Sequence, residues 1–530
     1  MTPVDVRSNP PVKRTDLDQA LASPWGRWLL PSYSDFFFIA VTLWLFSMGL
    51  GWSQLLLDGD TGWHIRTGEY ILQHSSVPTK DIFSWSRPNA DWFAWEWLSD
   101  VLYAKLFASL GMKGVVLFSG LLITGTGIVI LRNMIWRGAN AFLSVALTLL
   151  MLGAASIHYH ARPHVFTLFL LAVSSWMLAA DRITPSRAIW LLVPILLVWT
   201  NLHGGFAVLL ALIGLTAGGT LIEQALSWYQ TRAADWKVPA RYFLLFAACS
   251  GVTLLNPFGY RLHQHMVEYL SSSWIRDVVQ EFQSPNFRSE SMMQFEVLLA
   301  LGIVCVVPLL SRRRIVEALW ILYFAHQALS SARHVTLYVI VVTPLIASEL
   351  TTYWLRFAQG RTPKSTVGIL QQISADLIKG FRRTTVWTPA FMLALVLIGA
   401  PIKWPTDFSE EKFPIKVVDQ NQQLLIESKL LTTDQWGDYL LFRFYPKLRV
   451  FIDGRSDFYG PEIGKDYIAM LQGAWNWNDL LDRYGFDAVL APTEWPLNSL
   501  LKQRPEWKVV ADDGKVILYR RLRHGPQPGG

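Results

Sequence analysis

Long apolar runs separated by short polar loops recur through the first 404 residues of the chain. Runs of this length match the thickness of a bilayer core when they fold into helices. The pattern predicts eleven membrane spans, near 36–57, 114–131, 139–157, 164–180, 188–200, 206–222, 242–256, 296–310, 315–330, 335–350 and 386–402. The first run is too long for a signal-peptide core and has no cleavage site after it, so we expect a signal anchor.

Lys and Arg residues fall mainly in every second loop of this pattern. These residues are Arg132 and Arg137; Arg182 and Arg187; Arg232, Lys237 and Arg241; Arg312 to Arg314; and Arg356, Arg361, Lys364, Lys379, Arg382 and Arg383. Basic loops stay in the cytoplasm, which places the N-terminal segment 1–33 there as well. Because the number of spans is odd, the C-terminus is expected outside the cytoplasm. Two outer loops are long, 58–112 and 257–295, and the first contains two helical patterns.

The chain changes character near residue 405. Charged residues number 34 in 405–530, against 53 in the first 404 residues. Short β-branched runs alternate there with helical patterns, including expected strands at 448–452 and 487–491 and a hairpin at Asp513 and Gly514. The sequence therefore predicts a cytoplasmic segment 1–33, a transmembrane domain 34–404 and an extracytoplasmic α/β domain 405–530.

Composition excludes several classes of protein. Hydrophobic residues make up 52% of the chain and charged residues 16%, against about 25% charged in a soluble globular protein. The net charge of +7 comes from bases scattered over short loops, so we expect no nucleic-acid partner. Cys249 and Cys305 lie inside apolar runs, which leaves no disulfide framework and no thiolate metal site.

Paired acids follow the first span directly. Asp58 and Asp60 flank Gly59, and carboxylates at this spacing can share a divalent cation such as Mg²⁺ or Mn²⁺, or one of them can act as a base. The structural alternative is a polar end to the first span, with Asp60 capping a helix that begins at Thr61. His64 follows Asp60 by one helical turn, and it could join a metal site or orient a carboxylate that acts as a base.

A second acidic pair, Glu96 and Asp100, also lies one helical turn apart. Two acids on one face repel each other unless a cation or a hydrogen-bond donor lies between them. Helix capping and a solvated face explain the pair equally well.

Clusters of His, Asn and Arg lie at the outer ends of other spans. They are His158, His160, Arg162 and His164; Asn201 and His203; Asn256, Arg261, His263 and His265; Arg276 and Arg288; and Arg333 and His334. Each cluster alone is an ordinary interfacial anchor, but the predicted topology puts all of them on the same side as Asp58 and Asp60. Arginine suits phosphate recognition. We therefore expect an acidic centre ringed by cations, which fits an amphiphile with a phosphate or pyrophosphate head and an apolar tail.

Several motifs give the chain a family resemblance. DGDTGWHIRTGEYIL, PTKDIFSW, WEWLSDVLYA, RPHVFTLFLL, NLHGG, LNPFGYRL and IDGRSDFYG, with acids after the first span and a C-terminal α/β domain, resemble the GT-C superfamily of integral-membrane glycosyltransferases. More narrowly, the first-loop pattern DxDxxWHxRTGExI is similar to a group of bacterial multi-pass proteins described as glycosyltransferases of this type. The resemblance covers nearly the whole chain.

The resemblance implies a polyprenyl-phosphate-linked sugar as donor. It implies catalytic or metal-binding roles for Asp58 and Asp60; some GT-C members use a divalent cation there and others use none. From charge and sidedness we add Glu96 to the catalytic group. Substrate-binding candidates are His64, Arg162, His164, His203, Arg261, Arg333 and His334, with Trp63 and Trp97 for sugar stacking or membrane anchoring. The tail has no WWD-type acceptor motif, only Trp475, Asn476 and Trp477, which argues against asparagine-linked oligosaccharide transfer.

The expected protein is thus a polytopic α-helical membrane glycosyltransferase of GT-C type, in the bacterial cytoplasmic membrane. Its expected partners are the lipid-linked sugar, a lipid, glycan or protein acceptor, and the membrane lipids. One alternative is a transporter or flippase for lipid-linked saccharides, which would need charged residues along the spans rather than at one end. Another is a non-catalytic assembly subunit that uses the DGRSDFYG segment for docking.

Overall fold

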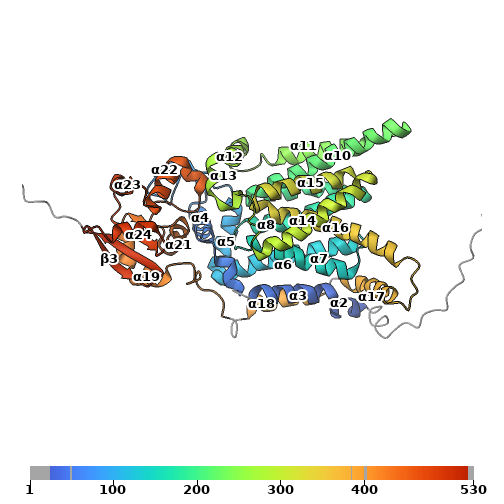
Figure 1. The fold of residues 1–530 in the computed structure, drawn as a ribbon, viewed down its shortest axis with the longest axis horizontal. Coiled ribbons are helices and arrows are strands. Elements are labelled where there is room, and N and C mark those ends of the chain that lie inside the picture. Colours follow the sequence, from blue (N-terminus) through green and yellow to red (C-terminus); the bar gives the residue numbers. More distant parts are fainter. Residues whose placement is uncertain (1–23, 48–50, 384, 399–402, 523–530) are drawn as a thin grey trace, which may run out of the picture.

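The computed structural model describes residues 24–47, 51–383, 385–398 and 403–522. Most of these residues are helical, and a small sheet lies near the C-terminus. Figure 1 shows the apolar helices running side by side as a bundle, with the tail from residue 403 onward at one end of it. Most of the predicted segment 1–33 lies outside the described residues, and the predicted domain division stays a prediction.

Helices of the bundle overlap the predicted spans. They are α3 (Tyr33–Ser47), α6 (Met112–Trp136), α7 (Ala141–Ala155), α8 (His164–Ile183), α9 (Leu192–Leu202), α10 (Ala207–Thr231), α11 (Lys237–Val252), α14 (Glu290–Ser311), α15 (Ile315–Ser330), α16 (Val335–Ala358) and α18 (Trp387–Leu397). However, α3 ends at Ser47, before the predicted end of the first span at 57, and α11 is less apolar than the others. Within the described part of the chain, six helices are long and apolar enough to cross a membrane, by length and composition. This confirms the predicted class of polytopic α-helical membrane protein.

The helix α16 forms the centre of the bundle. In its most apolar stretch 83% of the residues are buried, because neighbouring helices such as α6, α7, α8 and α15 pack around it. A helix that is apolar on all sides is stable only when it is enclosed in this way. The turn before α16, Ala332–His334, therefore has a fixed position at the end of the bundle.

Four helices from the two long loops lie between the bundle and the tail (Figure 1): α4 (Asp60–His74), α5 (Trp97–Leu110), α12 (Tyr260–Ser271) and α13 (Ser273–Val278). The helices α4 and α5 approach each other closely at Gly68, where a Cβ atom would collide with the carbonyl oxygen of Asp100. At the opposite end of the bundle lie α2 (Pro24–Leu29) and α17 (Thr366–Phe381).

The tail combines short helices with a four-stranded sheet. Its helices are α19 (Ile415–Gln420), α20 (Gln422–Glu427), α21 (Asp434–Phe444), α22 (Ser456–Leu471), α23 (Trp477–Tyr484) and α24 (Pro496–Leu501). The strands β1 (Leu430–Leu431), β2 (Ala488–Pro492), β3 (Trp507–Asp512) and β4 (Val516–Arg521) have the order β1-β2-β4-β3, in which only β1 and β2 are parallel. The predicted α/β character and the hairpin are confirmed.

The tail packs tightly on the first loop. Gly62 of α4 faces α21, where a Cβ atom would come within 2.8 Å of Phe442 Cβ. The predicted strand at 448–452 is wrong: its residues join no sheet, and Val450 instead exchanges backbone hydrogen bonds with the first loop, at Phe83 and Trp85. Contact with the first loop buries these apolar residues. Their sequence therefore resembles that of a strand although they lie outside the sheet.

Candidate active site

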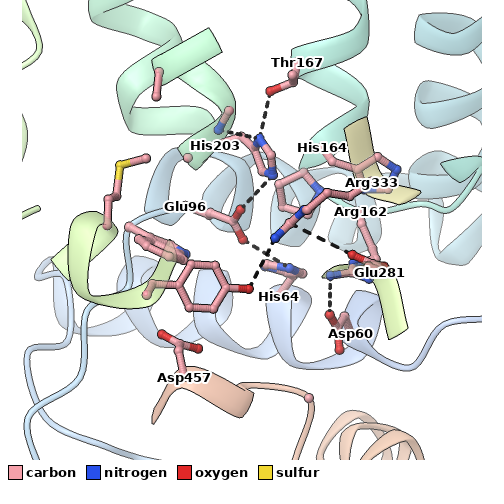
Figure 2. A pocket seen from close by; sticks show the side chains of 18 of the residues that line it. Asp60, His64, Glu96, Arg162, His164, Thr167, His203, Glu281, Arg333 and Asp457 are labelled. Carbon is pink, nitrogen blue, oxygen red and sulfur yellow. Dashed lines mark hydrogen bonds and ion pairs between the residues drawn. The ribbon is translucent and has the colours of Figure 1, made fainter. Parts of the chain in front are cut away.

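A cavity of about 230 Å³ lies where the bundle, the two long loops and the tail meet. The first loop contributes Asp60, His64 and Glu96; turns at the ends of bundle helices contribute Arg162, His203 and Arg333; and the tail contributes Gly454 and Asp457. Figure 2 shows the labelled side chains from these separate parts of the chain gathered around the cavity. The expected meeting of acids and cations at one end of the bundle therefore occurs.

Arg162 is the counter-ion of three carboxylates. One of its terminal nitrogens lies 2.6 Å from Asp58 and 3.3 Å from Glu281, and the other lies 2.7 Å from Asp60. Burial works against ionisation of Glu281, but Arg162 and Arg333 hold its pKa well below its usual range. The planar guanidinium is suited to such multiple contacts, and here the protein's own acids occupy it.

Asp60 has a second acidic neighbour, Asp438 of α21. A Cβ atom on Gly454 would collide with Asp60 Oδ1 and lie 2.9 Å from Asp438 Oδ2, so the two oxygens converge over this glycine. Burial raises the pKa of Asp60 to about 7, against the opposing effect of Arg162. Burial and Asp60 together raise the pKa of Asp438 well above its usual range. Neither Asp60 Oδ1 nor Asp438 Oδ2 has another hydrogen-bond partner among the described residues, and two buried carboxyl groups this close are costly to ionise together, which favours one proton shared between them.

His64 lies between the two other acids of the first loop. Its Nδ1 is 2.6 Å from Asp100 Oδ1, and its Nε2 is 3.5 Å from Glu96 Oε2. Burial holds the pKa of His64 well below its usual range, so the ring is neutral. Burial also raises the pKa of Glu96 to about 8 and that of Asp100 well above its usual range. The group that lies between these acids is thus a neutral imidazole.

His203 holds the other oxygen of Glu96. Its Nδ1 accepts hydrogen bonds from the backbone N–H of Gly205, at 2.9 Å, and from the Thr167 hydroxyl, at 2.8 Å. Because Nδ1 accepts the Gly205 N–H, it carries no proton, so the Thr167 hydroxyl donates to it, while the Thr167 oxygen accepts the Trp199 indole N–H. Burial lowers the pKa of His203 to about 3, so the neutral ring carries its proton on Nε2, 3.4 Å from Glu96 Oε1.

Arg333 has weaker contacts with carboxylates than Arg162 has. Its guanidinium lies over the Phe282 ring, 4.4 Å from the centroid, and donates to the Tyr269 hydroxyl at 3.5 Å. Its contact with Glu281 is 4.0 Å long. Because an aromatic ring and a hydroxyl neutralise charge far less than a carboxylate does, Arg333 keeps capacity for an anion in the cavity.

Most of the residues proposed from the sequence line this cavity. They are Asp60, Trp63, His64, Glu96, Arg162, His164, His203, Arg333 and His334. Asp58 lies beside the cavity, in contact with Arg162. Trp97 does not line it: its indole N–H donates to Asn201 at 2.8 Å, and the ring borders an apolar groove on the bundle surface. Arg261 is exposed on α12 and also lies away from the cavity.

Several residues of the cavity were not predicted as site residues. Glu281, Tyr269 and Asp457 line it, and Asp438 supports Asp60 from behind. Asp457 belongs to the DGRSDFYG segment. The high density of charged residues in this segment is the sequence feature that could have indicated a site residue there. In the same segment Arg455 pairs with Asp81 of the first loop at 2.8 Å. The segment therefore both contacts the first loop and borders the cavity.

The expected metal site at Asp58 and Asp60 does not fit the arrangement of these side chains. A guanidinium takes the Oδ2 atom of each carboxylate, where a shared divalent cation would need them. Within the described ranges, no group of three or more His, Cys, Asp or Glu side chains has metal-binding geometry. The positive charge at this point comes from Arg162.

No protein-family model and no curated protein sequence matches the chain. Among solved structures, the oligosaccharyltransferase of Archaeoglobus fulgidus in its apo form matches with a TM-score of 0.51 and 10% identity, over 87% of this chain and 69% of that one. The same organism's AglB, in complex with an inhibitory peptide and a dolichol-phosphate, matches with a TM-score of 0.49 and 11% identity, over 91% and 73%. ArnT from Cupriavidus metallidurans, bound to undecaprenyl phosphate, gives 0.45 and 13%, over 93% and 99%.

At these identities the likeness concerns the fold alone. The match to the apo oligosaccharyltransferase extends over 87% of this chain and supports the predicted fold class, a helical membrane bundle with a C-terminal α/β domain. It does not extend to the narrower bacterial group or to individual site residues.

Proposed function

We propose that the protein is a glycosyltransferase of the bacterial cytoplasmic membrane. It takes a sugar from a polyprenyl-phosphate-linked donor and passes it to a lipid, glycan or protein acceptor at the outer face, where the tail lies. The oligosaccharyltransferase-like fold supports this class of activity. One observation carries the proposal: Asp60, a carboxylate held by Arg162, and Arg333, a weakly neutralised arginine, line the same cavity at the end of the apolar helices.

Asp60 is the proposed base. The acceptor hydroxyl attacks the anomeric carbon of the donor sugar, its proton passes to the Asp60 carboxylate, and the bond between that carbon and the phosphate oxygen breaks. Arg162 and Asp438 orient the carboxylate. An ionised carboxylate has about four acceptor positions, so these two contacts leave capacity for the acceptor proton. Asp58 acts on the reaction indirectly, by sharing Arg162 with Asp60.

Arg333 is the proposed ligand of the donor phosphate, with His334 and His164 beside it in the cavity wall. Arg162 is less suited to this role because carboxylates occupy its guanidinium. Apolar side chains of the bundle, Leu168, Val208 and Leu337, line the same cavity, which suits a lipid next to the phosphate. Trp63 lines it from the first loop and offers an aromatic face to a sugar ring. No step of this reaction runs through a metal ion.

The direct test uses purified protein in lipid nanodiscs, a radiolabelled mixture of polyprenyl-phosphate sugars and an extract of envelope acceptors. We expect label to leave the lipid fraction and free polyprenyl phosphate to appear. A flippase would leave all label on the lipid while exposing it on the other face, and a non-catalytic assembly subunit would leave the lipid unchanged.

Replacement of Arg333 tests the phosphate site. Arg333→Ala is expected to raise the KM for the donor about tenfold or more, because charge-assisted contacts to phosphate contribute about 1.5–3 kcal/mol, and Arg333→Lys should recover part of it. The matched control is Arg261→Ala, an exposed arginine away from the cavity, with an unchanged KM. Equal donor KM values for Arg333→Ala and the unmodified protein would contradict the assignment.

Asp438 provides a test of how Asp60 is held. Asp438→Asn keeps an N–H donor towards Asp60 and should retain transfer activity within about threefold. Asp438→Ala removes the donor, which should raise the pKa of Asp60, move the pH–rate profile to higher pH and lower the rate at neutral pH about tenfold. Rate profiles between pH 6 and 9 measure this. Identical profiles for the alanine and asparagine variants would show that Asp438 only fills space.

A further inference from the structure

Asp100 is an enclosed acid with one polar side-chain partner in the described part of the chain. Its Oδ1 contacts His64 Nδ1 at 2.6 Å, while Oδ2 has no hydrogen-bond partner. The residue is 0% exposed, whereas the Glu96 side chain on the other side of the same imidazole is 12% exposed. The contact with His64 is short enough for a charge-assisted hydrogen bond. Sugar transfer as described above makes no use of Asp100.

The two acids and the imidazole between them hold at most one negative charge. Burial raises the pKa of Glu96 and of Asp100 together, and ionising both in one enclosed site is the costly state. His64 stays neutral, so it carries one ring proton. Above a pH of about 8, where Glu96 ionises, the position of that proton decides which of the two acids carries the charge.

Two arrangements satisfy these contacts. In the first, Glu96 is protonated and faces a bare Nε2 of His64, while the Nδ1–H donates to ionised Asp100. In the second, Nε2–H donates to ionised Glu96, and protonated Asp100 donates to Nδ1. To pass from the second to the first, the Asp100 O–H bond breaks as Nδ1–H forms, and Nε2–H breaks as the Glu96 O–H bond forms. The total charge stays at one unit, and no proton comes from solvent.

We propose that Glu96, His64 and Asp100 form a proton relay that moves negative charge out of the cavity, from Glu96 to Asp100, when an anionic phosphate binds. The proposal rests on the proposed function, from which it takes the phosphate. Within the relay, Asp100 is a positioning residue that acts on the ligand through His64 and Glu96.

The charged neighbours of the two acids favour this direction. Glu96 is faced by the cations Arg162 and Arg333, by the acids Asp60 and Asp457, and by the neutral ring of His203. The charged group that acts on Asp100 is Glu96. In the free protein, at a pH above the Glu96 pKa of about 8, the two arginines favour the charge on Glu96. A bound phosphate neutralises Arg333 and repels the Glu96 carboxylate, so the favoured position of the charge becomes Asp100.

The relay predicts a specific pH dependence of binding. In the unmodified protein the proton that neutralises Glu96 comes from Asp100, so phosphate binding takes up no proton beyond what the ligand itself requires. In Asp100→Asn this internal source is missing, and Glu96 must take a proton from solvent. The Kd of this variant should then rise with pH, by about tenfold per unit above the pKa of Glu96.

The experiment measures the Kd of undecaprenyl phosphate between pH 7 and 9 for full-length protein in nanodiscs. Titration of the ligand is common to all variants, so each profile is compared with that of the unmodified protein. We expect a steeper rise for Asp100→Asn, and the same rise for His64→Gln, which cannot pass a proton. The double variant Glu96→Gln/Asp100→Asn should return to the unmodified profile, because an amide in place of the Glu96 carboxylate needs no proton.

Each outcome bears on one of the two proposals. Superimposable profiles for Asp100→Asn and the unmodified protein would overturn the relay while leaving the proposed function intact. A double variant as steep as Asp100→Asn would also overturn it, since damage to the structure would then explain the change. If the unmodified protein does not bind undecaprenyl phosphate in this range, the donor assignment fails and the relay fails with it.

Discussion

Asp60→Asn is expected to lower the rate of sugar transfer by about a hundredfold or more, with the protein still folded and inserted. A positioned general base contributes about 10²–10⁴-fold to a rate, and an amide cannot accept the acceptor proton. The fold should survive because Arg162 keeps its contacts with Asp58 and Glu281. The measurement is the initial rate of label transfer by purified variants, with Asp91→Asn, an exposed acid of the same loop, as the matched control.

The pH dependence of the unmodified enzyme tests the same role. Burial raises the pKa of Asp60 to about 7, and the base acts only when it is ionised. The rate should therefore fall as the pH drops below about 7 and level off above it. A profile that is flat from pH 5.5 to 8.5, or an Asp60→Asn variant as active as Asp91→Asn, would contradict the assignment of Asp60 as base.

Replacement of Arg162 by methionine is expected to have the second large effect, on both stability and activity. Three acids, Asp58, Asp60 and Glu281, then lose their counter-ion in a largely enclosed site. Breaking such a buried contact costs about 3–5 kcal/mol. We expect a lower Tm in detergent and no detectable transfer.

Two further variants separate charge from packing at this position. Arg162→Met combined with Asp58→Asn removes one of the stranded charges and should recover part of the lost Tm. Arg162→Lys keeps the charge but lacks the planar fork, so it should fall between the methionine variant and the unmodified protein. Arg261→Met, in an exposed position, serves as the control. If Arg162→Met melts like that control, Arg162 is not the counter-ion of the site.

The apolar runs predicted the positions of the bundle helices because membrane helices leave a strong and local signal. Alternation of the basic loops then predicted that Asp60, Arg162 and Arg333 belong to the same end of the bundle, and the cavity brings these three together. The topology predicts at which end of the bundle a residue lies, but it does not predict which residues contact each other. In the sequence, Arg162 and Arg333 are equal candidates for the phosphate ligand. The packing of the folded chain shows that the three carboxylates pair with Arg162.

The remaining site residues depend on long-range packing, which no local pattern records. Asp438 meets Asp60 because glycines at 62 and 454 allow the first loop and the tail to approach closely. His64 meets Asp100 because Gly68 allows α4 to pack on α5. Arg261 lies away from the cavity because its position on α12 faces outward, and the predicted strand at 448–452 pairs with the first loop instead of the sheet.

The most direct measurement is a cryo-electron microscopy structure of the protein in nanodiscs with undecaprenyl phosphate. We expect the phosphate within hydrogen-bond distance of the Arg333 guanidinium, on the cavity side that faces Asp60, with the lipid chain against the bundle helices. Phosphate density outside the cavity, or a lipid bound at the opposite end of the bundle near α17, would contradict the account.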